Sequence, residues 1–513
     1  MSADDYDVIV VGCGPVGMVL SALLANAGVR VLALEREDEI GFRPRARHID
    51  GEAMRVLQSI GVADAGAEIM SPMQGALRLV GADGGTLLEQ RFDQTQRGRQ
   101  GWFEDYQLYQ PLLLGLLREH LDRSATARLR TSCEVTGVTQ NSERVSVEIR
   151  RGETGMSERV TAAYVVGCDG ANSFVRREIG ASLHALGPDH PFLVIDAFPM
   201  RAEYESPDLQ VSMIVCDPAR PHYASPGHGM TVPIRFEFMV MPGEDGEELT
   251  KPAALAGLTQ PYLDADEVHF ERAAVYVFHS LLLDQWRVGR VLLAGDAAHV
   301  QPPFMGQGLC SGFRDASNLA WKLAMVCRGE TDDGLLDSYQ SERSPHARDW
   351  INEANRIGAI VMTTNAAEAR ARDKRIRSGE SRELRPLQPR LGPGLHGDDP
   401  EPAGTLAPQP SLPDGRRLDD LLGPRFAVIT TDDLWRGVAA PLREAVEAAP
   451  HVVVVNEGVS AATELLAHYD SAAVILRPDR YVLGIAGDAS ALEGLLGRIP
   501  AISAAPAGAG LTH

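Results

Sequence analysis

A cluster of glycines near the N-terminus has the composition and spacing of a dinucleotide-binding turn. Gly12, Gly14 and Gly17 follow a short apolar run at residues 7–11 and open a segment with helical spacing. In such a turn the first glycine permits the sharp bend, the second lets backbone approach a pyrophosphate, and the third lets the helix lie close to the sheet. The helix N-terminus adds a partial positive charge that favours a phosphate by about 0.3–1 kcal/mol. The sequence therefore predicts a dinucleotide site.

Three acidic residues stand where apolar runs end. Glu35 closes the run at residues 29–34, and its carboxylate can accept both hydroxyls of an adenosine ribose. Glu35 alone does not separate FAD from NAD. Asp169, followed by Gly170, and Asp296 also stand where buried strands end, the usual place for cofactor contacts in an α/β sheet. Because a plain NAD-binding unit has no use for these two, the three segments together predict FAD.

The residues after Asp296 are suited to hold the flavin ring. Pro303 stiffens the turn, and Gly306 and Gly308 supply bare backbone amides before a helix that begins near Cys310. A helix N-terminus aimed at the flavin pyrimidine would stabilise the negative charge of reduced flavin.

These segments resemble the GxGxxG, Asp-Gly and Gly-Asp motifs of the group A FAD-dependent aromatic hydroxylases, which share the fold of para-hydroxybenzoate hydroxylase. The resemblance covers about residues 7–348 and is most specific over residues 295–323, GDAAHVQPPFMGQGLCSGFRDASNLAWKL. Residues 216–221 and 235–243 are similar to the 3-(3-hydroxyphenyl)propionate hydroxylase branch. The tail after residue 426 resembles the thioredoxin-like C-terminal domain of phenol-hydroxylase relatives, although it contains no cysteine.

The resemblance implies a set of FAD contacts. Asp296 would bind the ribityl chain, and the backbone amides of residues 308–310 would contact the isoalloxazine. Arg45 and Gln110 would lie at the pyrophosphate or ribityl region, and Asp169 would act at the pyrophosphate and in the use of NAD(P)H. Relatives often have Asn near position 310, and only a backbone contact survives the change to Cys. The expected cofactor-binding residues are Gly12, Gly14, Gly17, Glu35, Arg36, Arg45, Gln110, Asp169, Gly170, Asp296, Pro303, Gly306, Gly308, Leu309 and Cys310.

The resemblance also implies the reaction. NADH or NADPH would reduce FAD, and the reduced flavin would capture molecular oxygen as a C4a-hydroperoxide that hydroxylates a phenolic ring. No second nucleotide fingerprint is visible, so we expect NAD(P)H to bind transiently. The site must exclude water, which would release the oxygen as hydrogen peroxide. The reaction needs no metal.

Four residues are the candidates for substrate contact and catalysis. Arg235 would pair with a substrate carboxylate, and the alternative is an exposed strand arginine. His222 and Tyr223 would pass the phenol proton to solvent, or be ordinary loop or edge residues. His48 would face the flavin. We expect His299 to be a packing residue.

Several functions remain open at this point. The leading one is hydroxylation of a small phenolic acid of the 3-(3-hydroxyphenyl)propionate or hydroxycinnamate kind. A hydroxylase of a larger polycyclic natural product would have the same flavin site and a wider pocket. A flavin oxidase or reductase would consume NADH without inserting oxygen, and a non-catalytic NAD-binding sensor would purify colourless.

Composition restricts the partners and the compartment. The 513 residues include 70 acids and 49 bases, and the net charge of −21 argues against nucleic acid and anionic lipid. The six cysteines show neither CxxC nor zinc-site spacing. Asp4 and Asp5 stand where a signal peptide would carry a basic residue, and no apolar stretch is long enough for a bilayer. We therefore expect a cytoplasmic protein that binds a small aromatic substrate, with a homodimer as one expectation for its assembly.

The order of apolar segments predicts a fold of the α/β and α+β classes. A Rossmann-type FAD-binding domain would comprise residues 1–80, 105–180 and 285–345, interleaved with a sheet-rich substrate domain at 81–104 and 181–284. A helical connection at 346–390 and a linker at 391–415 would lead to a thioredoxin-like α/β domain at 416–513. Alternating residues at 131–148 and 235–241 predict half-buried antiparallel strands, and helices are expected over 318–328 and 344–365.

Overall fold

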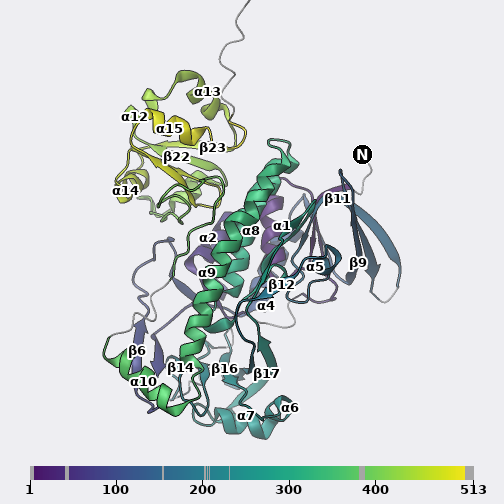
Figure 1. The fold of residues 1–513 in the computed structure, drawn as a ribbon, viewed down its shortest axis with the longest axis vertical. Coiled ribbons are helices and arrows are strands. Elements are labelled where there is room, and N and C mark those ends of the chain that lie inside the picture. The colour runs from purple at the N-terminus through teal and green to yellow at the C-terminus, as the bar shows by residue number, and fades with distance from the viewer. Residues whose placement is uncertain are drawn as a thin grey trace, which may run out of the picture.

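Two long helices run through the middle of the molecule, between a large sheet, a second sheet and a small C-terminal domain (Figure 1). They are α8 (Gly308–Cys327) and α9 (Asp337–Val361). The computed structural model describes residues 5–40, 46–152, 155–201, 204, 206, 208–229, 232–379 and 387–502. None of the helices in these ranges combines the length and apolar character that a membrane crossing needs.

The first sheet is a parallel sheet covered by helices, which carries the dinucleotide turn. Its strands have the order β19-β20-β11-β1-β2-β8, and the hairpin of β9 and β10 extends it antiparallel to β11. Val8, Ile9 and Val10 of β1 are fully buried, as expected for a strand covered on both faces. The strands are β1 (Asp5–Val11), β2 (Val31–Leu34), β8 (Ala127–Arg130), β9 (Cys133–Gln140), β10 (Val145–Arg151), β11 (Ser157–Gly167), β19 (Arg287–Val288) and β20 (Val291–Leu293), and the helices packed nearby include α1 (Pro15–Asn26), α4 (Gln110–Asp122) and α5 (Phe174–Glu178).

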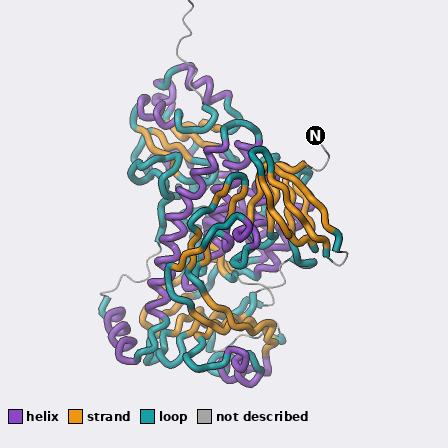
Figure 2. Tube along the Cα trace, turned by 45° about the vertical axis from the view of Figure 1, so that its right-hand side comes forward, coloured by secondary structure: helices purple, strands orange, loops and turns teal. Residues whose placement is uncertain are grey.

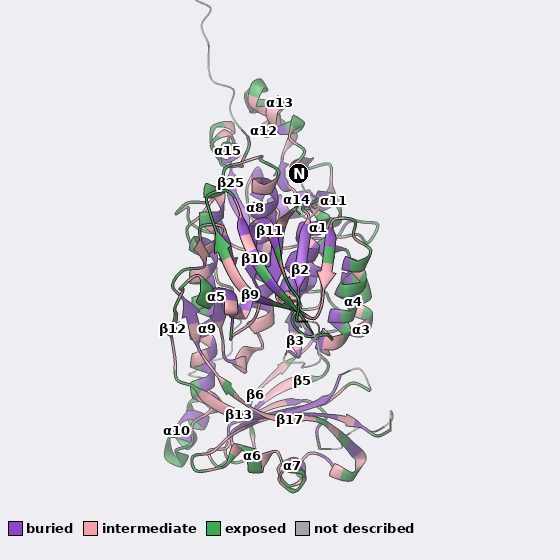
Figure 3. Ribbon diagram, turned by 90° about the vertical axis from the view of Figure 1, so that its right-hand side faces the viewer, coloured by how far each residue is buried: buried purple, intermediate pink, exposed green. Residues whose placement is uncertain are grey.

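The second sheet has seven strands and forms a separate layer below the first in Figure 3. Its order is β17-β13-β16-β15-β14-β5-β6, with only β14 and β5 pairing in parallel. A cluster of apolar side chains packs one face of it together with α7 (Pro252–Thr259). The strands are β5 (Ala76–Val80), β6 (Thr86–Arg91), β13 (His190–Pro199), β14 (Ser212–Val215), β15 (His222–Ser225), β16 (Ile234–Met239) and β17 (Val268–Phe278), and α6 (Gly246–Leu249) precedes α7.

The segments of the second sheet differ slightly from the expected domain ranges. It begins at Ala76 in β5, inside the range 1–80 that we expected to belong to the FAD-binding domain. The alternating segment 131–148 forms β9 and β10, which extend the first sheet. Alternation reports only that one face of a strand is buried, and it does not say which sheet the strand joins.

Short strands and helices connect the two large sheets. One small sheet has the order β3-β7-β4 and another has the order β12-β18-β21. Figure 2 shows the strands, in orange, gathered in separate groups with helices, in purple, among them. Their bounds are β3 (His48–Asp50), β4 (Ser71–Pro72), β7 (Asp105–Gln107), β12 (Leu183–Ala185), β18 (Leu281–Leu283) and β21 (His299–Val300), with α2 (Gly51–Ile60) and α3 (Ala63–Ile69) following β3. The short 3-10 turns are Ala265–Glu267, Gly295–Ala297, Pro303–Met305 and Asp333–Leu336.

The two central helices lie close to where the sequence predicts them. Helix α8 begins at Gly308, next to the start expected near Cys310, whereas α9 begins at Asp337, earlier than the expected 344. Pro345 lies inside α9. Helix α10 (Ala366–Arg377) follows α9.

The C-terminal domain is a four-stranded sheet with helices. The order is β23-β22-β24-β25, in which β22 pairs with β23 in parallel and with β24 antiparallel. Trp321 and Met325 of α8 belong to the core of this domain, so it is docked on the FAD-binding part by apolar contact. Its thioredoxin-like character stays a prediction. The elements are α11 (Leu418–Leu422), β22 (Phe426–Thr430), α12 (Asp432–Gly437), α13 (Ala440–Ala448), β23 (Val452–Asn456), α14 (Ser460–His468), β24 (Ala473–Leu476), β25 (Val482–Ala486) and α15 (Ala489–Leu496).

Candidate functional site

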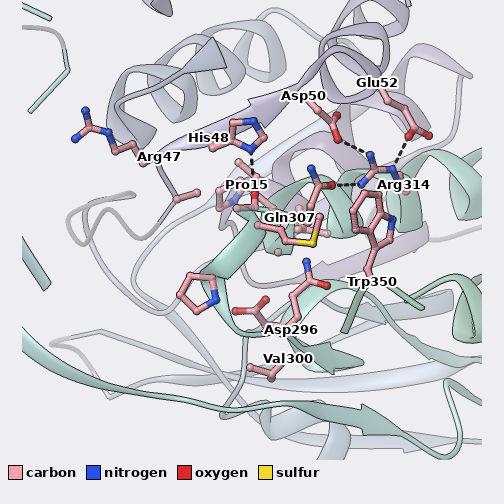
Figure 4. Close-up of a pocket in the computed structure, with 18 of the residues that line it drawn as sticks. Pro15, Arg47, His48, Asp50, Glu52, Asp296, Val300, Gln307, Arg314 and Trp350 are labelled. Atoms are coloured by element: carbon pink, nitrogen blue, oxygen red, sulfur yellow. Dashed lines mark hydrogen bonds and ion pairs between the residues drawn. The ribbon is translucent and has the colours of Figure 1, made fainter. Parts of the chain in front are cut away.

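One cavity of about 1290 Å³ extends from the dinucleotide turn to the second sheet and the C-terminal domain. Residues from all three predicted FAD segments line it, among them Gly14, Asp169 and Asp296. Figure 4 shows Asp296, His48 and Gln307 around the part of the cavity next to α8.

The three glycines of the turn meet different surroundings. Gly12 has a φ of +97°, and a Cβ there would lie 2.6 Å from the carbonyl oxygen of Cys168. A Cβ at Gly17 would lie 2.0 Å from the carbonyl oxygen of Gly12, so α1 packs directly on the turn. A Cβ at Gly14 would have no described protein atom within 4 Å. Gly14 therefore opens onto the cavity at the N-terminus of α1, which fits a pyrophosphate.

The predicted adenosine end of the site is held in place by backbone contacts. Glu35 Oε2 accepts a hydrogen bond from the Cys13 amide at 2.9 Å, and Oε1 accepts one from the Glu37 amide at 3.1 Å. These bonds fix the carboxylate at the cavity wall. Arg36 is exposed at the rim and pairs with Glu37 at 3.0 Å.

Of two further predicted contacts, the structure describes one, which lies at the start of α4. Gln110 is buried, lines the cavity and accepts a hydrogen bond from the Ala46 amide at 3.0 Å. Arg45 lies outside the described residues.

Asp169 fixes the conformation of the turn in which it lies. Its carboxylate accepts hydrogen bonds from the Ser173 hydroxyl at 2.5 Å and from the Phe174 and Val175 amides at 2.7 and 3.0 Å. Asp169 thus caps α5 and fixes the turn at Gly170, which has a φ of +80°. The residue lines the cavity, but its predicted role at the pyrophosphate stays a prediction.

A buried ionic cluster positions the turn that carries Asp296. The Gly295 amide donates to Asp315 Oδ2 at 3.0 Å, and His299 Nε2 lies 2.6 Å from the same oxygen. Arg343 Nε donates to Asp315 Oδ1 at 2.8 Å. Burial disfavours the charged carboxyl, but His299 and Arg343 outweigh it and lower the pKa of Asp315. His299 is therefore more than the packing residue that we expected.

The turn that is predicted to hold the flavin ring lies at the cavity wall. Gly306 has a φ of +65°, and a Cβ there would lie 2.9 Å from His48 Nδ1. Pro303, Gly306, Gly308 and Leu309 line the cavity, and Cys310 follows in the first turn of α8. The first amides of a helix have no acceptor inside it, so residues 308–310 can donate to a ligand.

His48 is held between two acceptors at the cavity wall (Figure 4). Its Nε2 lies 2.6 Å from Asp105 Oδ1, and its Nδ1 lies 3.2 Å from the Gly306 carbonyl oxygen. Burial disfavours the charged ring, but hydrogen bonds to Asp105 and Cys310 outweigh it and raise the pKa of His48 well above its usual value. Two acceptors at the two ring nitrogens suit an imidazolium, which donates from both.

Arg235 is buried and paired, not an exposed strand arginine. Its Nε and Nη2 donate to the two oxygens of Asp196 at 2.6 and 3.0 Å. Arg272 Nη2 also lies 2.6 Å from Asp196, and Glu237 lies 3.6 Å from Arg235 Nη1. Arg47 is buried beside them, and burial lowers its pKa to about 10. Among the described residues, three guanidinium groups thus lie near two carboxylates, which leaves one positive charge with both acids ionised.

His222 and Tyr223 are neighbours on β15, so their side chains point to opposite faces of the sheet. His222 Nε2 lies 2.5 Å from the Tyr262 hydroxyl and Nδ1 lies 2.7 Å from the Arg220 carbonyl oxygen. Its ring also packs on Phe238 at 4.9 Å. Both ring nitrogens are engaged and burial lowers the pKa of His222, which argues against a proton relay through it. Tyr223 lines the cavity and pairs in register with Glu237 of β16, and it remains the candidate for the proton relay.

The part of the cavity between the second sheet and α9 also has an apolar wall. Phe192 and Phe304 meet edge to face with ring centroids 5.9 Å apart. Such a wall can enclose an aromatic ring and exclude water from it. The other apolar side chains here are Leu77, Leu79, Ile214, Ile357 and Val361.

Comparison with known proteins identifies the family. The profile of the FAD binding domain family (FAD_binding_3) matches residues 5–354, and that of the HcaD C-terminal domain matches residues 404–498. The chain belongs to the FAD binding domain family. The predicted membership of the FAD-dependent aromatic hydroxylases and the predicted α/β and α+β fold are confirmed.

Curated relatives of this FAD-binding protein match nearly its whole length. A probable NADH-specific resorcinol 4-hydroxylase of Rhodococcus jostii (strain RHA1) is 36% identical over 512 residues, covering 95% of this chain and 93% of the relative. A 3-(3-hydroxy-phenyl)propionate/3-hydroxycinnamic acid hydroxylase of Mycolicibacterium smegmatis (strain ATCC 700084 / mc(2)155) is 34% identical over 520 residues, covering 93% and 90%.

Solved structures share the fold. Aklavinone-11 hydroxylase in complex with FAD and aklavinone has a TM-score of 0.79 at 25% identity, covering 98% of this chain and all (100%) of that one. The flavin-dependent monooxygenase PieE in complex with FAD and substrate has a TM-score of 0.82 at 21% identity, covering 98% and 99%.

Sequence reasoning missed several residues of the site. Asp315 and Arg314 stand inside the quoted motif without an assigned role, and Asp105 is distant in sequence from its partner His48. Arg47 had a local signal, because it stands directly before His48. The partners of the other three depend on chain crossings that spacing does not reveal.

Proposed function

We propose that this flavoprotein is an NADH-consuming monooxygenase that hydroxylates a phenolic ring carrying an acidic group, as in 3-(3-hydroxyphenyl)propionate or hydroxycinnamate. The observation that carries the proposal is the excess of one positive charge, counted over the described residues, around Arg47, Arg235 and Arg272 beside an apolar part of the cavity wall. Burial raises the pKa of Glu237, which strengthens this excess where Glu237 is protonated. The printed names of the two curated relatives support phenolic substrates, and the name of one supports NADH.

FAD, when bound, would supply hydride acceptance and oxygen activation. Gly14 and the N-terminus of α1 would hold its pyrophosphate. The amides of residues 308–310 and the imidazolium of His48 would stabilise negative charge on the ring. Phe192 and Phe304 would exclude water, and Tyr223 would exchange a proton with the substrate hydroxyl.

A second candidate is hydroxylation of a larger polycyclic compound. The cavity of about 1290 Å³ exceeds the ~300–1,000 Å³ of ordinary ligand pockets, although FAD would fill a large part of it. The aklavinone complex of a structural neighbour is in line with this alternative.

A coupled assay tests the proposal. Purified protein with FAD is mixed with NADH or NADPH and a panel of phenolic acids, matched neutral phenols and polycyclic phenols. We expect acidic phenols to stimulate NADH oxidation most and to yield a product heavier by one oxygen atom. Peroxide as the sole product with every phenol would refute oxygen insertion, and preference for polycyclic compounds would favour the second candidate.

A further inference from the structure

A loop of the C-terminal domain reaches into the FAD-binding part of the molecule. Residues 477–481 connect β24 to β25, and the buried side chains of Arg477, Asp479 and Tyr481 contact α8 or α9. Arg477 Nη2 donates to Glu342 at 2.8 Å and to Asp479 at 2.6 Å, and Lys322 Nζ donates to Glu342 at 2.7 Å. The last part of the long motif, which includes Lys322, therefore contacts the C-terminal domain rather than the cofactor site.

Tyr481 starts a chain of hydrogen bonds that ends at the flavin-facing turn. Its hydroxyl donates to Glu52 Oε1 at 2.9 Å, and Arg314 Nε donates to Glu52 Oε2 at 2.5 Å. Arg314 Nη1 donates to Gln307 Oε1 at 2.8 Å, as Figure 4 shows. Gln307 is the N-cap residue of α8, directly before the amides expected at the isoalloxazine.

We propose that Tyr481 is a positioning residue for the flavin-binding turn at the start of α8, acting through Glu52, Arg314 and Gln307. The proposal rests on the proposed FAD-dependent function. It assigns the C-terminal domain a part in the geometry of the cofactor site.

The two carboxylate oxygens of Glu52 accept hydrogen bonds from two different donors, and this arrangement is the physical basis of the proposed role. One carboxylate oxygen faces Tyr481 and the other faces Arg314, whose Nη2 pairs with Asp50. Without the Tyr481 hydroxyl, Glu52 is free to turn both oxygens toward Arg314, because arginine and carboxylate favour bidentate pairing. That rotation would pull the guanidinium away from Gln307 and loosen the turn.

Docking of the C-terminal domain does not depend on this hydroxyl. The domain is also held by the Lys322–Glu342–Arg477 cluster and by the ion pair of Arg55 with Asp419 at 2.6 Å. Trp321 adds apolar contact. Docking of the domain therefore does not account for the hydrogen bond of the Tyr481 hydroxyl.

The test compares Tyr481→Phe with Tyr469→Phe. Tyr469 belongs to the same domain, and within the described ranges its buried hydroxyl has no hydrogen-bond partner. Apoprotein of each variant is titrated with FAD, and the melting temperature without FAD and the visible circular dichroism of bound FAD are recorded. We expect Tyr481→Phe to raise the Kd for FAD about tenfold and to change the dichroism, and Tyr469→Phe to match the wild type.

A double-mutant cycle separates transmission from a general loss of stability. Gln307→Ala removes the far end of the chain, so Tyr481→Phe should have little further effect on the Kd in that background. Additive effects, or an unchanged Kd and spectrum in Tyr481→Phe, would overturn the positioning role while leaving the proposed function intact. If Tyr481→Phe does not fold, Glu52→Gln replaces it in the same comparison. Wild-type apoprotein that takes up no FAD would overturn both proposals.

Discussion

Gly14 and Gly17 offer the sharpest check on the cofactor site, because a side chain at each would meet different surroundings. A methyl group at Gly14 would enter open cavity, whereas one at Gly17 would lie 2.0 Å from the Gly12 carbonyl oxygen. Contact between carbon and a carbonyl oxygen needs about 3.3 Å, so α1 would have to retreat by roughly 1.3 Å in Gly17→Ala. The two alanine variants should therefore fail in different ways.

The expected magnitudes follow from these surroundings. Gly17→Ala should destabilise the apoprotein by about 1–3 kcal/mol, the usual cost of overpacking. Gly14 has a φ of −64°, which alanine adopts without strain, so Gly14→Ala should change apoprotein stability by less than about 1 kcal/mol. Its methyl group would occupy space that we assign to the pyrophosphate, and a cost of about 1–3 kcal/mol there raises the Kd for FAD about 5- to 150-fold.

Urea unfolding of the apoproteins and fluorescence titration with FAD measure the two effects separately. Wild-type affinity in Gly14→Ala would refute the placement of the pyrophosphate beside α1. Wild-type stability in Gly17→Ala would refute the close packing of α1 on the turn.

Three further changes test other parts of the site. The pKa of His48 is raised in the folded protein, so the protonated ring stabilises the fold. This contribution is fully present below about pH 6.5 and is lost as the pH rises through the folded-state pKa. His48→Gln should therefore flatten the alkaline decline of stability in thermal unfolding across about pH 6 to 9. Arg235→Ala leaves buried Asp196 short of a partner and should lower the free energy of unfolding in urea by about 3–5 kcal/mol. In the folded variant, KM should rise more for phenolic acids than for neutral phenols. Equal increases in KM would remove Arg235 from substrate binding. Asp296→Ala should lower the flavin absorbance of purified protein without changing the apoprotein melting temperature, and full retention of flavin would contradict its assignment.

The core of the FAD-binding part was predictable because its signals are local. The strand at residues 7–11, the glycine turn and Glu35 lie within about thirty residues, and short-range spacing determines how backbone bends and where a helix begins. The same holds for the turn before α8, where Gly306 must adopt a φ of +65°.

Long-range pairing was not predictable in the same way. Asp315 was visible in the motif, but its contacts with His299 and Arg343 depend on how α8 and α9 cross. His222 and Tyr223 looked equivalent in sequence, and both line the cavity, but only the tertiary structure shows that the His222 ring is already bonded to Tyr262 and to the Arg220 carbonyl oxygen.

By itself, the sequence predicted an FAD site built from three separated segments, because turns and strand ends are encoded by neighbouring residues. The tertiary structure alone decided which charged groups meet beside the cavity and how Tyr481 is linked through Glu52 and Arg314 to Gln307. These depend on side chains up to several hundred positions apart, and only the packing of sheets and helices sets which charges are buried together.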